Sequence, residues 1–186
     1  GGATLGDRIR MTEWHADPDV FVRSMASRRF GGGLAQHTLT VAHVFDAAGF
    51  DPIVIETVGA GQDEVAIASL AHSTVLVQVP GLGDGVQTLK AGSLEIGDII
   101  AVAKGDRPEA LALARDLRRL QTLRDDMETL EGAWRTRVIT TSAVERTGID
   151  TLLDALEEHR SWLESSGVGE QRTRMMLGTE IAARLR

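Results

Sequence analysis

Residues 98–103 read Asp-Ile-Ile-Ala-Val-Ala, a short and almost continuous apolar run that contains three β-branched residues. Comparable runs occupy residues 52–58, 73–79 and 137–141. Runs of this kind, without polar alternation, are typical of strands that are buried on both faces of a parallel sheet. We therefore predict four strands, paired mainly in parallel.

Helical patterns separate most of these strands, at residues 86–95, 108–120 and 149–163. Strands that alternate with helices along a chain form a parallel sheet with helices on both faces. The sequence thus predicts an α/β fold built on a doubly wound, mainly parallel sheet.

Further helices are expected outside this alternation. Asp17 and Pro18 are a typical helix start, a capping residue followed by proline at the first helical position, so we predict a helix that runs to about Arg28. A second helix should span about residues 34–48. From about Val168 onward, arginines alternate with apolar residues, which predicts an amphipathic C-terminal helix outside the sheet.

The composition excludes several classes of protein. The net charge of −7 argues against a broad face that binds nucleic acid. The absence of cysteine excludes disulfides and thiolate metal sites, and the five histidines show no spacing typical of a metal site. No apolar run approaches the ~20 residues of a membrane-spanning helix. We therefore expect no nucleic-acid or membrane partner, and a cytoplasmic location fits these features.

Polar residues follow the strand at 52–58, where ligands bind in such sheets. Glu56 closes the strand, and a carboxylate in that place can hold Mg²⁺. Gly59 would let a backbone N–H approach a terminal phosphate, and Gln62 could orient a water molecule for phosphoryl transfer. The alternative is a polar strand end followed by a glycine turn.

Two further strands end in residues suited to a guanine base. Lys104 and Asp106 follow the strand at 98–103, and the Asp106 carboxylate can accept hydrogen bonds from N1–H and the 2-amino group of guanine. Ser142 and Ala143 follow the last strand and can offer backbone N–H groups to the guanine carbonyl. The alternatives are a surface turn and the beginning of a helix. The order of the three segments is that of the guanine-nucleotide motifs in P-loop GTPases.

The same segments resemble the MeaB/ArgK family of P-loop GTPases over nearly the whole chain. Residues 56–62, Glu-Thr-Val-Gly-Ala-Gly-Gln, resemble its switch II signature, with Glu in place of the usual Asp. Residues 5–11 resemble the segment after its Mg²⁺-binding switch, and residues 17–25 resemble its next block. Residues 81–98 are similar to an additional switch region of the family.

The resemblance implies a P-loop NTPase-type fold, with a GTPase domain at 1–163 and a C-terminal dimerisation helix at 164–186. It implies binding of GTP or GDP with Mg²⁺. The implied residues are Asp7 and Glu56 for the metal, Glu56, Gly59 and Gln62 for catalysis, and Lys104, Asp106, Ser142 and Ala143 for guanine.

The function that the resemblance implies is GTP hydrolysis by a homodimeric chaperone of a cobalamin-dependent acyl-CoA mutase, such as methylmalonyl-CoA mutase. Two alternatives remain. One is a G-domain-like binding module that does not hydrolyse GTP, and the other is a kinase associated with arginine or ornithine transport.

Two features depart from the family pattern. The sequence contains no Gly-x-x-x-x-Gly-Lys-Ser/Thr loop, and its first methionine is Met11. We expect the segment that carries this loop to lie upstream of the sequence given, and the chain alone to bind GTP poorly. Ala103 replaces the family's Asn, which should weaken nucleotide binding without removing the preference for guanine.

Overall fold

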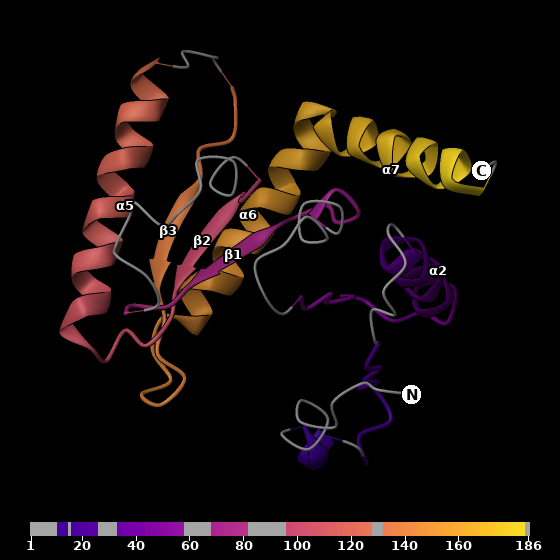
Figure 1. Cartoon of the computed structure of the whole chain (residues 1–186), viewed down its shortest axis with the longest axis horizontal. Helices are drawn as coiled ribbons and strands as arrows, with labels where there is room; N and C mark the ends of the chain where they lie inside the picture. The colour runs from indigo at the N-terminus through magenta and orange to yellow at the C-terminus, as the bar shows by residue number, and fades with distance from the viewer. Residues whose placement is uncertain are drawn as a thin grey trace. The chain divides into compact units, whose positions relative to one another are not determined.

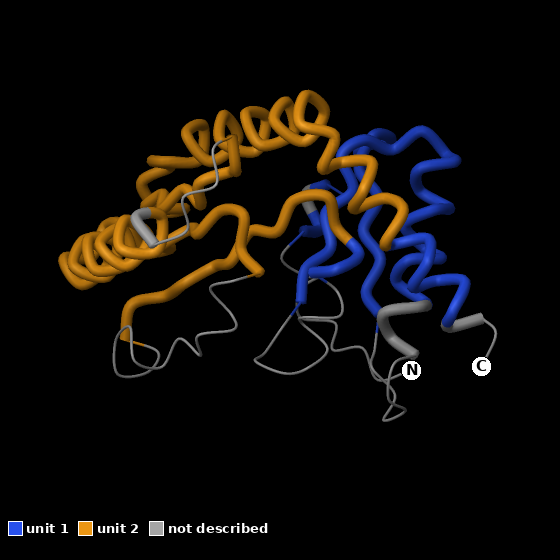
Figure 2. The backbone as a smooth tube through the Cα atoms, turned by 90° about the horizontal axis from the view of Figure 1, so that it is seen from above, with its two compact units in different colours: residues 1–70, 176–186 blue, residues 71–175 orange. Residues whose placement is uncertain are grey.

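A computed structural model of the chain describes residues 11–14, 16–25, 33–57, 68–81, 96–127 and 132–184. The chain divides into two compact units (Figure 2). One comprises residues 1–70 and 176–186, and the other comprises residues 71–175. The three strands found among the described residues all belong to the second unit.

The second unit is organised around a three-stranded sheet (Figure 1). Its strands are β1 (Val75–Gln78), β2 (Ile99–Val102) and β3 (Arg137–Thr140), in the order β1-β2-β3. Both pairs are parallel, with Val75 opposite Ile99 and Ile99 opposite Arg137. The prediction of a parallel α/β sheet is confirmed, and three of the four expected strands are present in the described residues.

The central strand β2 is buried on both faces, as its apolar run predicts. Ile100 and Val102 pack against α5 (Pro108–Met127), which connects β2 to β3. Ile99 packs toward α6 (Ile149–Ser166), which follows β3. Figure 1 shows α5 and α6 on opposite sides of the sheet. Successive β2 residues therefore face different helices, which explains why polar alternation is missing from the run.

The prediction of a strand at 52–58 is wrong within the described residues. Residues 51–57 contain no strand, and no strand among the described residues pairs with them. Val54 is 84% exposed, so this run is not buried as expected. A β-rich sequence becomes a strand only where a neighbour satisfies its backbone hydrogen bonds, and the described residues supply none here.

The helix predicted from Asp17 to Arg28 is also corrected within the described residues, which end at Met25 in this segment. The Asp17 carboxylate does accept the N–H of Asp19, at 2.9 Å, as a capping residue would. The chain then leaves the turn instead of continuing as a helix. Phe21 packs edge-on against Phe45, and this aromatic contact outweighs the local start signal.

The other helices agree with the predictions or lie outside the described residues. The helix predicted at 34–48 is α2 (Gly33–Ala47), and the C-terminal helix is α7 (Val168–Arg184). A short 3-10 turn, η1, spans Thr12–Trp14. The helix predicted at 86–95 falls outside the described residues. No helix in the described ranges is long and apolar enough to cross a membrane.

Candidate functional site

The turn after β2 presents Asp106 at the carboxyl end of the sheet. Ala103 N–H donates to the carbonyl of Gln78 at 2.8 Å, which extends the β1–β2 pairing by one residue. Lys104 then adopts a left-handed conformation, with φ of 58°, and its carbonyl accepts the N–H of Arg107 at 2.9 Å. This closed turn leads directly into Pro108, the first residue of α5, so Asp106 is exposed just before a helix begins.

The loop after β3 is closed by its own backbone. Ser142 and Thr147 exchange two hydrogen bonds, at 3.0 and 3.1 Å. The Ser142 side chain is fully buried, and its hydroxyl accepts the N–H of Glu145 at 3.2 Å. Ala143 lies exposed within the loop. The loop is therefore fixed around Ser142, while its tip faces solvent.

The structure brings the two loops into direct contact. The Ser142 hydroxyl donates to Oδ1 of Asp106 at 2.8 Å. Gly105 N–H donates to the carbonyl of Thr141 at 2.8 Å. Of the residues expected to hold guanine, Asp106 and Ser142 thus touch each other, and Lys104 and Ala143 lie in the same two loops.

The Asp106 carboxylate is held in its charged form. The hydrogen bond from Ser142 lowers the pKa of Asp106 below its ordinary value of 3.8, with further help from a backbone N–H and from the positive charges of Arg107 and Lys104. An ionised carboxylate only accepts hydrogen bonds, and it has about four acceptor positions. Ser142 uses one of them, so the exposed group can still accept two donors from a ligand.

The residues expected at the phosphate end are largely outside the described part of the chain. Asp7, Gly59 and Gln62 fall in the undescribed segments. Glu56 is described, and it is exposed in the first unit, in a segment that forms no strand. Within the described ranges, no group of three His, Asp or Glu side chains could hold a metal ion. The metal and catalytic assignments therefore remain predictions.

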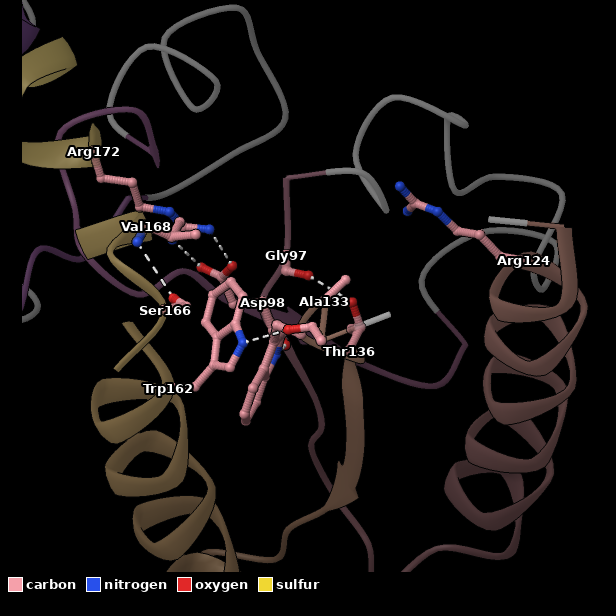
Figure 3. Close-up of a pocket in the computed structure, with 11 residues that line it drawn as sticks. Gly97, Asp98, Arg124, Ala133, Thr136, Trp162, Ser166, Val168 and Arg172 are labelled. Carbon is pink, nitrogen blue, oxygen red and sulfur yellow. Dashed lines mark hydrogen bonds and ion pairs between the residues drawn. The ribbon is translucent and has the colours of Figure 1, made fainter. Parts of the chain in front are cut away.

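A second cluster lies at the opposite, amino-terminal ends of the strands, and sequence reasoning missed it. A pocket of about 490 Å³ opens there between α5, α6 and the start of α7 (Figure 3). Its charged lining residues are Asp98, Arg124 and Arg172, and Trp134 and Trp162 supply aromatic surface. Both indole N–H groups are bonded to backbone carbonyls, of Asp98 and Gly132 respectively.

Asp98 is the centre of this cluster. Only 8% of the residue is exposed, and its carboxylate accepts two hydrogen bonds from Arg172 and one from the N–H of Thr74. Nε2 of the fully buried His159 lies 3.4 Å from Oδ1, a long distance for a hydrogen bond. Nδ1 of His159 is 2.7 Å from the Ser73 hydroxyl.

These contacts decide the charge of Asp98. Burial alone would raise its pKa, but His159, Arg172 and the Thr74 N–H outweigh burial and lower the pKa to about 2. The same ion pair raises the pKa of Arg172. The pair is therefore charged at neutral pH, and its hydrogen bonds are satisfied within the unit. We interpret this cluster as structural.

Comparison with known proteins decides the family. The family model described as "Methylmalonyl Co-A mutase-associated GTPase MeaB" matches residues 1–184. The chain belongs to the MeaB family. The family assignment that the residues of the sequence suggested is thereby confirmed.

Individual relatives agree with this assignment. A protein of Pyrococcus abyssi, named as a candidate GTPase, is 48% identical over 181 residues, which cover 97% of this chain and 56% of that protein. The GTPase ArgK of Escherichia coli is 34% identical and covers 90% of this chain and 50% of its own length. A mouse mitochondrial protein named "methylmalonic aciduria type A homolog" is 33% identical, with coverage of 90% and 40%. The chain thus spans about half the length of these relatives.

A solved structure supports the fold. The crystal structure of an LAO/AO transport system kinase has a TM-score of 0.70 to this chain, at 24% identity. The match covers 82% of this chain and 49% of the other. It confirms the α/β fold with a parallel sheet that the sequence predicts.

Proposed function

We propose that this chain supplies the guanine-reading part of a GTP-binding and GTP-hydrolysing protein. The observation that carries the proposal is the contact between Asp106 and Ser142, which fixes a charged acceptor at the carboxyl end of the sheet. Guanine presents two adjacent donors, N1–H and the 2-amino group, whereas adenine presents no such pair. A fixed carboxylate therefore favours guanine, and it leaves an unpaired acceptor against adenine.

Hydrolysis needs residues that lie mostly outside the described part of the chain. We propose that Asp7 and Glu56 hold Mg²⁺ when nucleotide binds, that Gly59 contacts the terminal phosphate and that Gln62 orients the attacking water. The bound Mg²⁺ would neutralise charge on the phosphates. The exposure of Glu56 supports this proposal, because an exposed carboxylate is accessible to a metal ion.

The partner and the assembly are proposals that rest on different observations. The names of the family and of the mouse relative support a cobalamin-dependent acyl-CoA mutase as partner, with methylmalonyl-CoA mutase as the first candidate. The exposed side chains of Met175, Leu177 and Ile181 on α7 support a dimer contact at residues 164–186. Apolar residues gathered on one helix usually meet a partner surface.

A second candidate is a binding module that holds nucleotide or partner without hydrolysis. Ala103 favours it, because its methyl group cannot make the hydrogen bonds of the family's Asn. The Asp106–Ser142 contact is compatible with both candidates. A measurement of GTP hydrolysis is therefore needed to distinguish the hydrolysing protein from the binding module.

The test compares two forms of the protein. One is the chain itself, and the other is the chain extended with an upstream segment that carries the phosphate-binding loop. Both would be titrated with fluorescent mant-GDP, with mant-ADP as the control, and assayed for phosphate release from GTP. We expect the extended form to bind GDP over ADP and to turn over GTP. Equal binding of GDP and ADP would remove the proposal, and GDP binding without turnover would favour the binding module.

A further inference from the structure

At Gly105, the turn that carries Asp106 packs directly against the end of β3. A Cβ atom at position 105 would lie 2.7 Å from Cγ2 of Thr140 and 3.1 Å from the carbonyl oxygen of Thr141. Carbon atoms in contact normally stay about 3.5–4.0 Å apart, so even a methyl group does not fit there. The turn can therefore lie this close to β3 only because Gly105 has no side chain.

The atoms that fill this space cannot easily move away. The N–H of Thr141 donates to the carbonyl of Val102 at 2.8 Å, and Thr140 pairs with Val102 in the sheet register. On the other side, the carbonyl of Thr140 lies against Gly148, where a Cβ would come within 2.1 Å of it. The end of β3 is therefore held by the sheet and by the start of α6. A side chain at 105 would displace the turn instead.

Three hydrogen bonds join β2 and the turn after it to the end of β3, and two of them depend on this close approach. They are Thr141 N–H to Val102, Gly105 N–H to Thr141, and the Ser142 hydroxyl to Asp106, each at 2.8 Å. The last two involve the turn itself. Bringing a new Cβ from 2.7 Å to an ordinary contact distance of about 3.5 Å requires the turn to shift by about 0.8 Å. The same shift would stretch both 2.8 Å bonds beyond hydrogen-bonding distance, so Asp106 would lose the donor that orients it.

We infer that Gly105 is a specificity-determining position of the guanine site, because its missing side chain lets the β2 turn seat against Thr140 and Thr141 and so holds Asp106 in reach of Ser142. The inference rests on the proposed guanine function and adds a residue to it. Gly105 occupies the variable position of the x-Lys-x-Asp pattern, so the pattern itself does not mark the residue. Gly105 acts as a positioning residue, since it acts through Asp106.

The test uses the full chain with three single variants and one double variant. Gly105→Ala introduces the clash, and Ser142→Ala removes the donor without a clash. Gly178→Ala is the matched control, because a Cβ at Gly178 has nothing within 4 Å. In the double variant, Thr140→Ser removes the methyl group nearest to the new Cβ, so it should partly rescue Gly105→Ala. If Gly105→Ala alone fails to fold, the double variant, in which the clash is reduced, still allows the pKa of Asp106 to be measured with an alanine at position 105.

Two readouts separate this inference from the proposed function. The first is an NMR titration of the Asp106 side-chain carboxyl. Its pKa should rise toward the ordinary value in Gly105→Ala and in Ser142→Ala, should recover in part in the double variant, and should stay unchanged in Gly178→Ala. An unchanged pKa of Asp106 in Gly105→Ala would overturn the inference, whether or not the protein binds guanine.

The second readout is the binding of guanosine and inosine, followed by NMR line broadening of the two probes. Inosine lacks the 2-amino group, so the wild-type chain should favour guanosine, and Gly105→Ala should lower this preference roughly tenfold. A preference retained in Gly105→Ala would overturn the inference. A wild-type chain that does not distinguish the two nucleosides would count against the proposed function instead, while the carboxyl titration would still decide the role of Gly105.

Discussion

Arg172 binds the carboxylate of Asp98 through both terminal nitrogens, Nη1 at 2.9 Å and Nη2 at 2.7 Å (Figure 3). Nη1 also donates to the carbonyl of His72 at 2.6 Å. Two parallel hydrogen bonds fix both direction and distance, which a lysine in this place could not do. The first turns of α7 are thereby attached to the amino-terminal end of β2, at the end of the sheet opposite Asp106.

Replacing Arg172 should therefore destabilise the protein. Arg172→Met keeps much of the side-chain volume but leaves the carboxylate of Asp98 nearly buried without its main partner. Arg172 is itself partly exposed, so we expect a loss of about 2–3 kcal/mol in the free energy of unfolding. Urea unfolding followed by circular dichroism measures this loss.

Arg174→Met is the control for that experiment. Arg174 pairs with Glu170 on the same helix at 3.5 Å, and both side chains are 80% exposed. An exposed pair of this kind contributes at most about 0.5 kcal/mol, so this variant should unfold almost as the wild type does. Equal losses in the two variants would contradict the structural role of Arg172.

The stability of the protein should depend on pH through Asp98. Its pKa is lowered from 3.8 to about 2 in the folded protein. The folded-state pKa lies below the unfolded one, so the contribution is fully present above pH ~4 and is lost as the pH falls toward ~2. The shift corresponds to about 2 kcal/mol of stability. Asp98→Asn should flatten this part of the curve of unfolding free energy against pH. An unchanged curve would mean that other carboxylates cause the acid sensitivity.

Part of the molecule follows from local sequence patterns. The apolar run at 98–103 predicted a doubly buried strand, and β2 confirms it, because its two neighbours β1 and β3 are described and pair with it. The similar run at 52–58 failed as a prediction because strand formation depends on a neighbour, which no single segment encodes. The start signal at Asp17 predicted a helix, and this prediction was wrong within the described residues: the Asp17 carboxylate caps a turn, and Phe21 then packs on Phe45 instead of continuing a helix.

In the candidate site, too, local sequence patterns could be predicted, whereas contacts between distant segments could not. The Lys104–Asp106 and Ser142–Ala143 segments could be recognised because each follows a strand, and parallel strands end at one edge of the sheet. The role of Gly105 was not visible, because it depends on the distance to Thr140 across two loops. The Asp98–Arg172 pair joins residues 74 positions apart, and no spacing rule connects them.

The apolar residues on α7 provide a prediction on assembly. Met175, Leu177 and Ile181 are 72%, 46% and 59% exposed. If these side chains form a dimer contact, replacing all three with Gln should yield a monomer in sedimentation equilibrium. The three substitutions leave Arg172 in place, so its hydrogen bonds to Asp98 at the start of α7 are kept.

Leu111 and Leu123 of α5 are the matched control for assembly. Both are similarly exposed, at 55% and 62%, but they lie on a helix for which we propose no dimer contact. Replacing both with Gln should leave the mass of the particle unchanged. A wild-type chain that sediments as a monomer, or a triple variant that keeps the wild-type mass, would contradict the proposed contact.

Ala103 provides a prediction on affinity. In a form of the chain extended with an upstream segment that carries a phosphate-binding loop, Ala103→Asn should tighten GDP binding, since the amide can hydrogen-bond where a methyl group cannot. One additional neutral hydrogen bond would lower the dissociation constant roughly fivefold. Isothermal titration calorimetry with GDP measures the change. Unchanged or weaker binding would mean that the role of the family's Asn does not transfer to this position.

The most direct test of the account is the selectivity of Asp106→Asn in the same extended protein. GTP and ITP differ only in the 2-amino group, which ITP lacks. We expect the variant to lose about 1.5–3 kcal/mol of binding free energy for GTP, because charge-assisted hydrogen bonds are removed, and clearly less for ITP. Competition titrations against mant-GDP give both affinities. A larger loss for GTP than for ITP is the result that the account predicts, and an equal loss for the two nucleotides would show that Asp106 does not read the base.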